Sequence, residues 1–396
     1  MEIIKIAIDL TQIPADKTGI GIYASNLARE MCILNNISQK FSFVFFVQND
    51  DSDLIHVLTE SDQAKKNTII PVESGIYRKI LSRIFFEQAL LPRQCRKLDV
   101  NLIFSTHYTI PYFTRIKRVV AFHDMTFYLF PELHQGIKKF YFKTLIPLSM
   151  KKSNAIITVS ESTKNDMLSR FKRLDPSKMV VIHHGVEFLK DKERDMDYAW
   201  EKISKKHQLN QREYFLFVGT LEPRKNIIGI IKAFHHVVQS DEKYMKYKLV
   251  IVGKKGWFYN EIFETTKKLQ VEKFVIFTGY LSEDEKQALL LNAFLFLYPS
   301  FYEGFGIPIL EAMAHGVPVI TGNSSALPEV AGGAALLVNP HHWQEISTAM
   351  LKLLSDGILY EKLSQKGLER TEKFSWEKTA AKTMELFEKL AVERSK

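Results

Sequence analysis

The second half of the 396-residue chain alternates short, continuously apolar runs with stretches whose apolar residues recur at helical spacing. We predict strands at residues 214–218, 249–252, 274–277, 293–298, 317–320 and 334–338, and helices at 227–238, 258–269, 283–291 and 308–315. Strands that are apolar throughout are typical of a parallel sheet that is buried on both faces. Repeated strand–helix units therefore predict a doubly wound α/β domain, with its ligand at the carboxyl ends of the strands.

The first half repeats this pattern less regularly. Candidate strands lie at residues 3–10, 41–47, 68–72, 102–105, 118–122, 155–159 and 179–182, and a candidate helix at 20–34. A domain boundary is expected near residues 184–192, where Gly185 precedes a polar, charged stretch. We therefore predict domains at 1–188 and 189–374, followed by a C-terminal helix at 375–396. The spacing of its apolar positions predicts a buried stripe of Trp376, Ala380, Thr383, Met384, Phe387 and Leu390.

The composition excludes several classes of protein. The chain is 46% apolar and 25% charged, as soluble globular proteins are, and no apolar run approaches the roughly 18 residues of a membrane span. The N-terminus enters a predicted strand at once and lacks the layout of a signal peptide. Two cysteines, Cys32 and Cys95, are too few for a disulfide framework or a metal cluster. We therefore expect a cytoplasmic protein without a bound metal.

The positive charge is concentrated in the first half of the chain. Residues 1–188 hold 25 Lys and Arg against 18 Asp and Glu, so they carry +7 of the net charge of +9. A basic half favours anionic partners, such as a phosphorylated substrate, a membrane surface or nucleic acid. Because the sequence contains no nucleic-acid-binding motif, we expect no nucleic-acid partner.

Two carboxylates, Glu303 and Glu311, flank a glycine-rich turn and the start of a predicted helix. The turn consists of Gly304, Phe305, Gly306 and Ile307, and Pro308 follows it. Proline loses no hydrogen bond in a first helical turn, and glycines let a ligand approach the backbone. The amides and the positive end of the helix dipole would then bind an anion such as a diphosphate. The alternative is an amphipathic helix with two solvated acids.

Two adjacent cations, Arg224 and Lys225, follow a predicted buried strand in the sequence Glu222-Pro223-Arg224-Lys225-Asn226. At the carboxyl end of a strand they suit a diphosphate, because Arg224 offers a fork of donors and Lys225 a point charge. The alternative is a solvated basic helix start, which the helix dipole disfavours.

Three further candidates follow other predicted strands. Gly19 and Gly21 form a Gly-x-Gly turn after the first strand, which either contacts a phosphate or sugar or is simply a tight turn. His123 follows the strand at 118–122 and is either a ligand contact or a satisfied structural histidine. Tyr280 follows the strand at 274–277 and is either a nucleotide contact or a core residue.

These motifs together resemble those of a known family. Glu303, seven residues and Glu311, set in EGFGIPILEAMAHGVPVI, resemble the signature of the retaining glycosyltransferases of family 4. The resemblance continues at residues 219–226 and near the N-terminus, so it covers nearly the whole chain. It implies the GT-B architecture, in which two Rossmann-like, doubly wound domains face a central cleft and the final helix crosses back onto the N-terminal domain. It also implies that 1–188 binds the acceptor and 189–374 the nucleotide-sugar donor.

The resemblance assigns roles to the candidate residues. It implies that Arg224, Lys225 and the amides of 304–307 stabilise the leaving diphosphate, that Glu303 contacts sugar hydroxyls and that Glu311 accepts hydrogen bonds from the ribose diol. It places the expected catalytic residues at His123, Arg224, Lys225 and Glu303. The other donor-binding residues would be Gly19, Gly21, Tyr280, Gly304, Phe305, Gly306, Ile307 and Glu311. No metal or other cofactor is expected, because Arg224 and Lys225 supply the positive charge.

The resemblance also favours one reaction. It indicates transfer of a hexose with retention, and the residues around Arg224 together with 122–124 and 131–132 look most like the mannosyltransferase branch, which uses GDP-mannose. The acceptor would be a growing surface polysaccharide or a lipid-linked sugar. Two alternatives remain, a sugar-nucleotide epimerase or hydrolase on the same fold and a non-catalytic, membrane-associated scaffold. One departure from the family is His183-His184-Gly185-Val186 at the junction, where relatives carry Pro-Asn-Gly-Val.

A basic amphipathic segment at residues 75–98 forms a possible second site. Six cations stand in it against the single acid Glu87, interleaved with aromatic and aliphatic residues. Such a segment can lie on an anionic membrane, here at its inner face and near a lipid-linked acceptor. The alternative is a core-packed helix with a solvated basic face.

Overall fold

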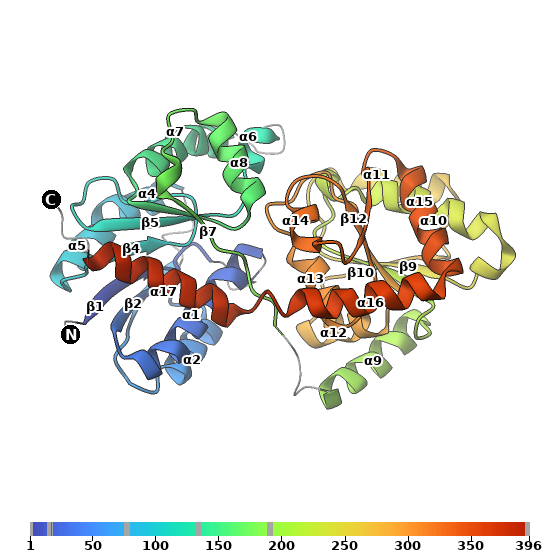
Figure 1. The fold of residues 1–396 in the computed structure, drawn as a ribbon, viewed down its shortest axis with the longest axis horizontal. Coiled ribbons are helices and arrows are strands. Elements are labelled where there is room, and N and C mark those ends of the chain that lie inside the picture. The colour runs from blue at the N-terminus through green and yellow to red at the C-terminus, as the bar shows by residue number, and fades with distance from the viewer. Residues whose placement is uncertain are drawn as a thin grey trace. The chain divides into compact units, whose positions relative to one another are not determined.

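A computed structural model of the chain describes residues 3–13, 17, 19–74, 80–130, 136–187 and 193–392. The contacts within the chain divide it into two compact units (Figure 1). Unit 1 consists of Met1–Gly185 together with Phe374–Lys396, and unit 2 of Val186–Lys373. Parts of four predicted features, at residues 75–79, 131–132, 188–192 and 393–396, lie outside the described residues.

Unit 1 is built on a sheet of seven strands in the order β3-β2-β1-β4-β5-β6-β7, and all neighbours are parallel. The strands are β1 (Ile4–Asp9), β2 (Phe41–Gln48), β3 (Thr68–Val72), β4 (Leu102–Ser105), β5 (Lys117–Phe122), β6 (Ala155–Thr158) and β7 (Met179–Val181). The chain runs outward in one direction from β1 to β3 and in the other from β4 to β7. The order therefore switches between β1 and β4, and ligands of such sheets bind at the carboxyl ends beside the switch.

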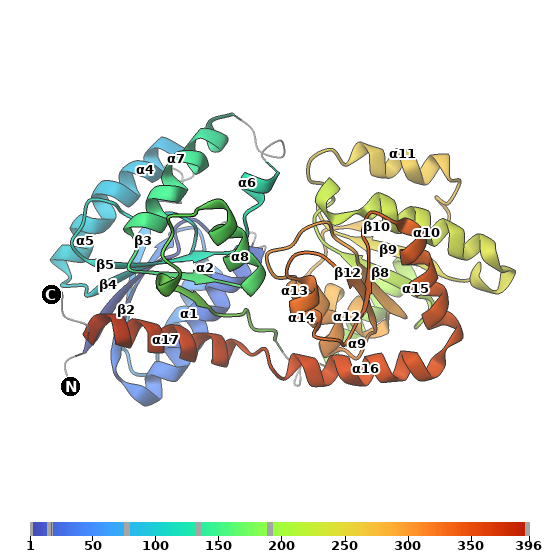
Figure 2. The same ribbon diagram turned by 45° about the horizontal axis from the view of Figure 1, so that its top comes forward.

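Helices cover both faces of this sheet (Figure 2). They are α1 (Gly19–Ser38), α2 (Ser52–Ser61), α4 (Ile80–Phe85), α5 (Leu91–Lys97), α6 (Thr126–Leu129), α7 (Gly136–Lys152), α8 (Glu161–Arg170) and α17 (Trp376–Val392). A π-helical turn, η1 (Phe86–Leu90), joins α4 to α5, and a short 3-10 helix, η3 (Pro176–Lys178), precedes β7.

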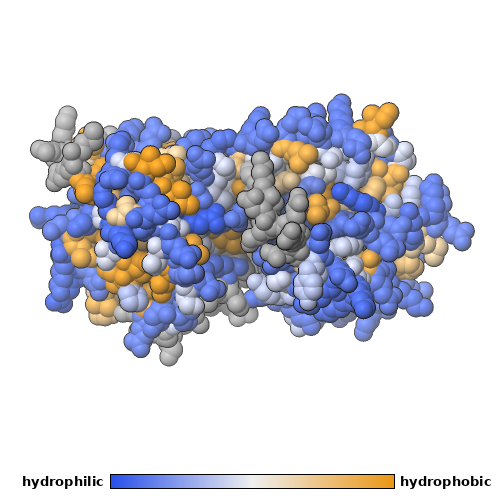
Figure 3. Space-filling model, turned by 90° about the horizontal axis from the view of Figure 1, so that it is seen from below, coloured by the Kyte–Doolittle hydropathy of each residue, from blue (hydrophilic) through white to orange (hydrophobic). Residues whose placement is uncertain are grey.

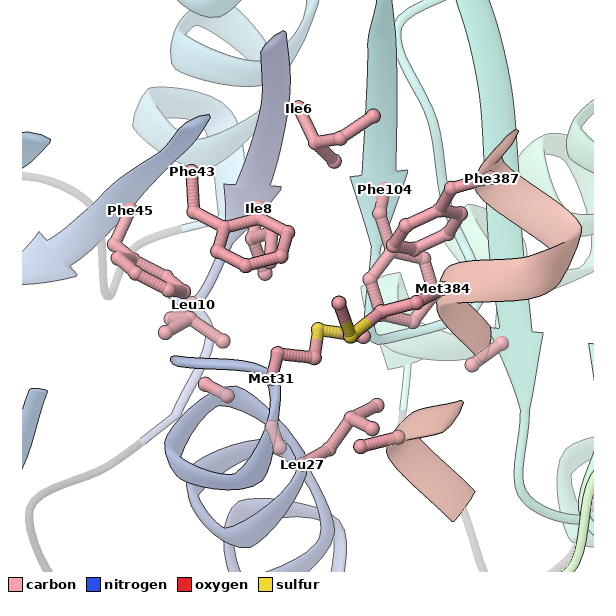
Figure 4. Packing of buried hydrophobic residues seen from close by; sticks show 14 of the residues in the cluster. Ile6, Ile8, Leu10, Leu27, Met31, Phe43, Phe45, Phe104, Met384 and Phe387 are labelled. Atoms are coloured by element: carbon pink, nitrogen blue, oxygen red, sulfur yellow. The ribbon is translucent and has the colours of Figure 1, made fainter. Parts of the chain in front are cut away.

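The C-terminal helix α17 completes the core of unit 1 (Figure 4). Met384 and Phe387 of α17 meet Leu27 and Met31 of α1 over the strand side chains, and the Phe387 ring lies 5.2 Å from that of Phe104. Every position of the predicted apolar stripe is buried. Since a buried side chain of this size contributes about 1.5–3 kcal/mol, α17 is an integral part of unit 1.

Two segments of unit 1 that are distant in sequence touch at Gly185. A Cβ atom at Gly185 would lie 2.2 Å from the backbone nitrogen of Trp376, so this crossing requires glycine. The preceding residue, His184, is buried and packs on Trp376 with ring centroids 6.0 Å apart. His184, which stands where relatives of the family carry Asn, is thus a buried side chain next to the contact between Gly185 and Trp376.

Unit 2 is built on six parallel strands in the order β10-β9-β8-β11-β12-β13. The strands are β8 (Tyr214–Val218), β9 (Lys248–Val252), β10 (Val275–Gly279), β11 (Leu295–Tyr298), β12 (Val319–Gly322) and β13 (Leu336–Val338). The order switches between β8 and β11, which places the expected ligand site of this unit at the carboxyl ends of these two strands.

Helices lie on both sides of the unit 2 sheet (Figures 1 and 2). They are α9 (Glu193–His207), α10 (Ile227–Ser240), α11 (Asn260–Lys268), α12 (Glu283–Asn292), α13 (Ile307–Ala314), α14 (Leu327–Ala331), α15 (Trp343–Ser355) and α16 (Gly357–Thr371). Two 3-10 helices, η4 (Pro223–Lys225) and η5 (Glu242–Tyr244), stand before α10 and after it. The prediction of two doubly wound α/β units with parallel sheets is confirmed.

Among the described residues, no helix combines the length and the apolar character needed to cross a membrane. The face drawn in Figure 3 is largely hydrophilic, with its hydrophobic residues in separate patches.

Candidate active site

The loops after β8 and β11 meet at the switch point of unit 2. The loop after β8 contains η4 and ends at Asn226, whose φ of 56° is left-handed. The Asn226 side-chain amide donates to the carbonyl oxygen of Pro299 over 3.1 Å, and the Phe301 amide donates to that of Arg224 over 2.9 Å. These bonds hold the two loops together and bring the predicted site residues of each loop into one place.

Two cations and two carboxylates form a buried cluster there. Arg224 Nη1 lies 2.8 Å from Glu303 Oε2, and Lys225 Nζ lies 2.7 Å from Glu303 Oε1. Arg224 Nη2 also pairs with Glu222 Oε1 at 2.5 Å. Glu222, Lys225 and Glu303 are each at most 7% exposed. The two positive charges are thus balanced by two negative charges. A buried charge without a partner would destabilise the fold.

The environment of the cluster keeps Glu303 ionised. Burial alone would raise the pKa of Glu303, but Arg224 and Lys225 outweigh it and hold that pKa at about 2. The pKa of Lys225 is lowered, first by burial and second by the neighbouring Arg224, against the pull of Glu303. Both pKa values are lowered, which favours the charged form of Glu303 and disfavours the charged form of Lys225. The reason is that the carboxylate faces two cations, whereas the ammonium group faces another cation as well as the carboxylate. The pair is ionic, with the larger gain on the Glu303 side.

Tyr298, the last residue of β11, is a member of the cluster that sequence reasoning missed. Its hydroxyl accepts a hydrogen bond from Lys225 Nζ over 2.6 Å, and the same nitrogen lies 4.9 Å from the centre of its ring. An ammonium group has three hydrogens. Tyr298 and Glu303 take two of those on Lys225, and no further hydrogen bond of Lys225 Nζ is found among the described residues. The third is available to a ligand. The sequence feature that could have pointed to Tyr298 is a polar hydroxyl at the carboxyl end of an otherwise apolar, buried strand.

The glycine-rich turn presents backbone to the same region. Gly306 has a φ of 102°, which other residues rarely adopt, and a Cβ there would lie 2.8 Å from a methyl group of Leu327. Gly306 is the N-cap of α13, and Ile307 is its first residue. The Glu303 amide donates to Ser325 Oγ over 2.9 Å, which fixes the start of the turn. The turn therefore directs the positive end of α13 beside the cluster.

Glu311 does not pair with the cations of the cluster. It lies one turn into α13, and its Oε1 atom is 2.9 Å from Nζ of Lys286 on α12. The side chain of Glu311 is 15% exposed. It is therefore a partly buried, paired acid and not the solvated surface acid of the alternative interpretation.

Tyr280 lies outside the core of unit 2. It follows β10, it is 61% exposed, and Lys254 Nζ lies 4.4 Å from the centre of its ring. Because β9 and β10 are neighbours, both residues stand at the carboxyl edge of the sheet. The core-packing alternative for Tyr280 is wrong.

His123 lies in unit 1, directly after β5. Its Nε2 atom is 2.8 Å from the carbonyl oxygen of Thr106, which can only accept, so Nε2 carries the hydrogen. Burial lowers the pKa of His123 to about 4, and the ring is therefore neutral near pH 7. In that tautomer Nδ1 is an acceptor, and it has no hydrogen-bond partner among the described residues. His123 is thus only half satisfied, because the buried Nδ1 lone pair receives no hydrogen bond from the described residues.

Gly19 and Gly21 lie in the first turn of α1 in unit 1. This helix follows β1, one of the two strands between which the strand order switches. A Cβ on Gly19 would meet nothing within 4 Å, so the backbone there is open to approach. A Cβ on Gly21 would lie 3.1 Å from a methyl group of Ile13, so this glycine serves packing. Nearby Lys17 pairs with the buried Asp51 over 3.1 Å.

The part of the chain that the structure describes contains no group of three His, Cys, Asp or Glu side chains that could hold a metal ion. The positive charge at the unit 2 switch point is supplied by Arg224 and Lys225.

Comparison with known proteins identifies the family. The family model described as glycosyltransferase family 4 matches residues 18–188, and that of the glycosyl transferases group 1 matches residues 200–370. The chain belongs to glycosyltransferase family 4. The protein is therefore a glycosyltransferase, and both the predicted family and the GT-B class of fold are confirmed.

Curated relatives and solved structures agree with this family. O-antigen chain mannosyltransferase B of Escherichia coli is 28% identical over 387 residues, which cover 94% of this chain and 96% of that protein. O-antigen chain mannosyltransferase RfbU of Salmonella typhimurium is 32% identical over 243 residues, 61% of each chain. Anabaena HepE, solved with UDP and glucose, has a TM-score of 0.72 at 16% identity and covers 98% of this chain and 100% of its own, so it shows the fold alone.

Proposed function

We propose that this glycosyltransferase transfers mannose from GDP-mannose to a glycan or lipid-linked acceptor in surface polysaccharide synthesis, with retention of anomeric configuration. One observation carries the proposal, namely the buried Arg224–Lys225–Glu303 cluster at the switch point of unit 2. The relatives named O-antigen chain mannosyltransferases support the sugar and the class of acceptor.

The cluster suits departure of a nucleoside diphosphate. Negative charge develops on the leaving phosphate in the transition state, and preorganised cations stabilise it strongly in a site that excludes water. Lys225 has an ammonium hydrogen to offer, and the positive end of α13 lies beside it. A phosphate would accept this third hydrogen, while Glu303 would keep its bond to Lys225 and accept from sugar hydroxyls at its remaining acceptor positions.

The other residues would orient the two substrates. We assign the ribose diol to Glu311 and the base end to Tyr280, because both stand at the carboxyl edge of the unit 2 sheet. His123 would accept a hydrogen bond from a substrate hydroxyl through Nδ1. Its low pKa makes the neutral ring a weak base, so the departing phosphate, and not His123, would take the proton of the acceptor hydroxyl. Gly19 would allow close approach of the substrate to α1.

We further propose that unit 1 contacts an anionic membrane through the segment at 75–98. Of its described part, Leu81 is 81% exposed and Phe85 is 60% exposed. Phe113 is 82% exposed, and its loop is bound to this segment because Gln88 donates to the carbonyl oxygen of Ile110 over 2.9 Å. The exposed cations are Arg93, Arg96 and Lys97. Exposed apolar side chains beside cations favour an anionic lipid surface.

Two charged residues of this segment do not belong to its exposed face. Glu87 is 1% exposed and accepts from Thr109 Oγ1 over 2.6 Å, and Arg83 bonds to Thr109 Oγ1 over 3.4 Å. Burial raises the pKa of Glu87 to about 7 despite Arg83. The prediction that counted Arg83 among the cations of the basic face is corrected, because Arg83 and Glu87 both bond to Thr109, which follows β4 at the carboxyl edge of the unit 1 sheet.

A thermal-shift screen with GDP, UDP, ADP and CDP tests the donor. A ligand at about 100 times its Kd adds about 2.7 kcal/mol and raises the melting temperature by several degrees. A shift with GDP, followed by transfer from GDP-mannose to a mannosylated acceptor, is expected. A shift with UDP alone would refute GDP-mannose, and donor consumption without product on any acceptor would favour a hydrolase.

A further inference from the structure

Lys286 links two helices of unit 2 through the second carboxylate of the family signature. Its Nζ atom lies 2.9 Å from Glu311 Oε1 on α13 and 2.9 Å from Glu283 Oε1 on its own helix, α12. The side chains of Lys286 and Glu311 are 12% and 15% exposed, whereas Glu283 is 59% exposed. The less exposed partner of Lys286 is therefore Glu311.

The charge of Lys286 is maintained by its partners. Burial alone would lower the pKa of Lys286, but Glu311 first and Glu283 second raise it above its usual range. Removing one partner of a buried ion pair leaves the other charge uncompensated. Lys286 therefore fixes the position of the Glu311 carboxylate through this ion pair.

The pairing uses only one of the two oxygens of Glu311. Lys286 donates to Oε1, and among the described residues no hydrogen bond to Oε2 is found. A carboxylate has about four acceptor positions, so the lysine fixes the orientation of the group and leaves positions for other donors. Vicinal hydroxyl groups could occupy these positions together.

We propose that Lys286 is a positioning residue that orients the Glu311 carboxylate toward the ribose diol of the nucleotide. Through Glu311, it makes the site bind ribose nucleotides more tightly than deoxyribose nucleotides. The inference rests on the proposed function, which places the nucleotide at Glu311. Lys286 itself does not touch the substrate. Its effect passes entirely through Glu311, and this distinguishes it from a lysine that only joins two helices.

Nucleotide affinity measured by calorimetry tests this role. The ligands are GDP and UDP, each in its ribose form and as the 2′,3′-dideoxy form. The proteins are wild type, Lys286→Met, Lys286→Arg, Glu311→Gln and the double variant Lys286→Met/Glu311→Gln. The quantity compared is the ratio of the dideoxy Kd to the ribose Kd within each protein. A general loss of stability changes both constants alike and leaves this ratio unchanged.

For the wild type we expect a ratio of about ten or more, as charge-assisted hydrogen bonds to the diol would give. Lys286→Met should bring the ratio close to one, Lys286→Arg should restore most of it, and Lys286→Met should add nothing in the Glu311→Gln protein. The control is Lys202→Met, because Lys202 pairs with Glu285 of α12 over 3.1 Å but is 63% exposed. It should keep the wild-type ratio.

Two results would overturn the inference separately from the proposed function. If the wild type binds GDP or UDP and Lys286→Met keeps the wild-type ratio, Lys286 has no positioning role while the donor site stands. If Lys286→Met weakens both sugar forms equally, the lysine is only structural. A wild type that binds neither nucleotide would overturn the donor site and, with it, the role of Lys286.

Discussion

The ammonium nitrogen of Lys225 lies 2.7 Å from a carboxylate oxygen of Glu303, and both side chains are buried. These residues come from loops after different strands, and the loops meet because β8 and β11 are neighbours at the switch point of unit 2. The pair joins the cation expected to hold the diphosphate to the acid expected to hold the sugar. A change at either residue should therefore affect both functions.

Lys225→Ala should reduce the rate of sugar transfer by about 10- to 100-fold. The variant removes one charged contact to the leaving phosphate, which contributes roughly 1.5–3 kcal/mol. Initial rates with saturating donor would measure the loss. Lys232→Ala, which removes an exposed lysine of α10, should leave the rate unchanged. Wild-type turnover by Lys225→Ala would remove this lysine from the mechanism.

Glu303 should make the stability of the protein depend on pH in the acidic range. Its pKa is lowered from 4.5 to about 2 in the folded protein, so its contribution is complete above pH 4.5 and is lost as the pH falls toward 2. A shift of this size corresponds to roughly 3 kcal/mol. Urea unfolding of wild type and Glu303→Gln between pH 7 and pH 3 should show a stability difference that shrinks with acid. A constant difference would contradict the ionic pair.

His123 should remain neutral throughout the physiological range. Because burial lowers its pKa to about 4, its ring protonates only well below the usual value of 6.5. The stability linked to this shift is present above pH 6.5 and is lost as the pH falls through 4. Two-dimensional NMR of the imidazole nitrogens should show hydrogen on Nε2 and no titration between pH 8 and pH 5.5. A titration midpoint of the ring near pH 6.5 would show instead that His123 is exposed to solvent.

Removal of divalent metals should leave transfer unchanged. The cluster supplies two positive charges where the diphosphate would lie, so we expect no need for a bound cation. Dialysis against EDTA followed by rate measurements, with and without added Mg²⁺ or Mn²⁺, checks this. Activity that vanishes on dialysis and returns with a metal would refute the expectation.

The exposed apolar residues of the 75–98 segment should govern binding to anionic lipid. Leu81→Ser with Phe85→Ser should abolish flotation with vesicles that contain phosphatidylglycerol, because both side chains are exposed. The matched control is Ile358→Ser, which changes a residue of unit 2 that is 85% exposed. Equal flotation of all variants, or none for the wild type, would refute membrane contact through this segment.

The sequence predicted the strands well because a parallel sheet buries them on both faces. The run at 214–218 coincides with β8, and 102–105 coincides with β4. Helices were predicted less completely. Helix α9 was missed because most of its residues are charged or polar, and α7 because Pro147 interrupts its pattern. Strand order could not be predicted, since it depends on contacts between segments far apart in the chain.

The candidate site was predictable residue by residue but not as an arrangement. The patterns around Arg224 and Glu303 placed each side chain at the carboxyl end of a strand. They did not show that Glu303 bridges both cations, or that Tyr298 completes the cluster, since these contacts depend on which strands are neighbours. The Lys286–Glu311 pair was equally hidden, because a lysine within an exposed-looking helix carries no signal of its own.

The contact between Gly185 and Trp376 has a consequence for how this chain could be rebuilt. Unit 2 leaves unit 1 after Gly185 and returns at Phe374, so it is an uninterrupted insertion within another domain. Since the exit and the return touch, a short loop could replace the insertion and leave the core around α17 closed. A different domain of similar fold could likewise be inserted between Gly185 and Phe374. The chain is thus organised as one domain that is continuous in space, with a second domain inserted between two of its segments.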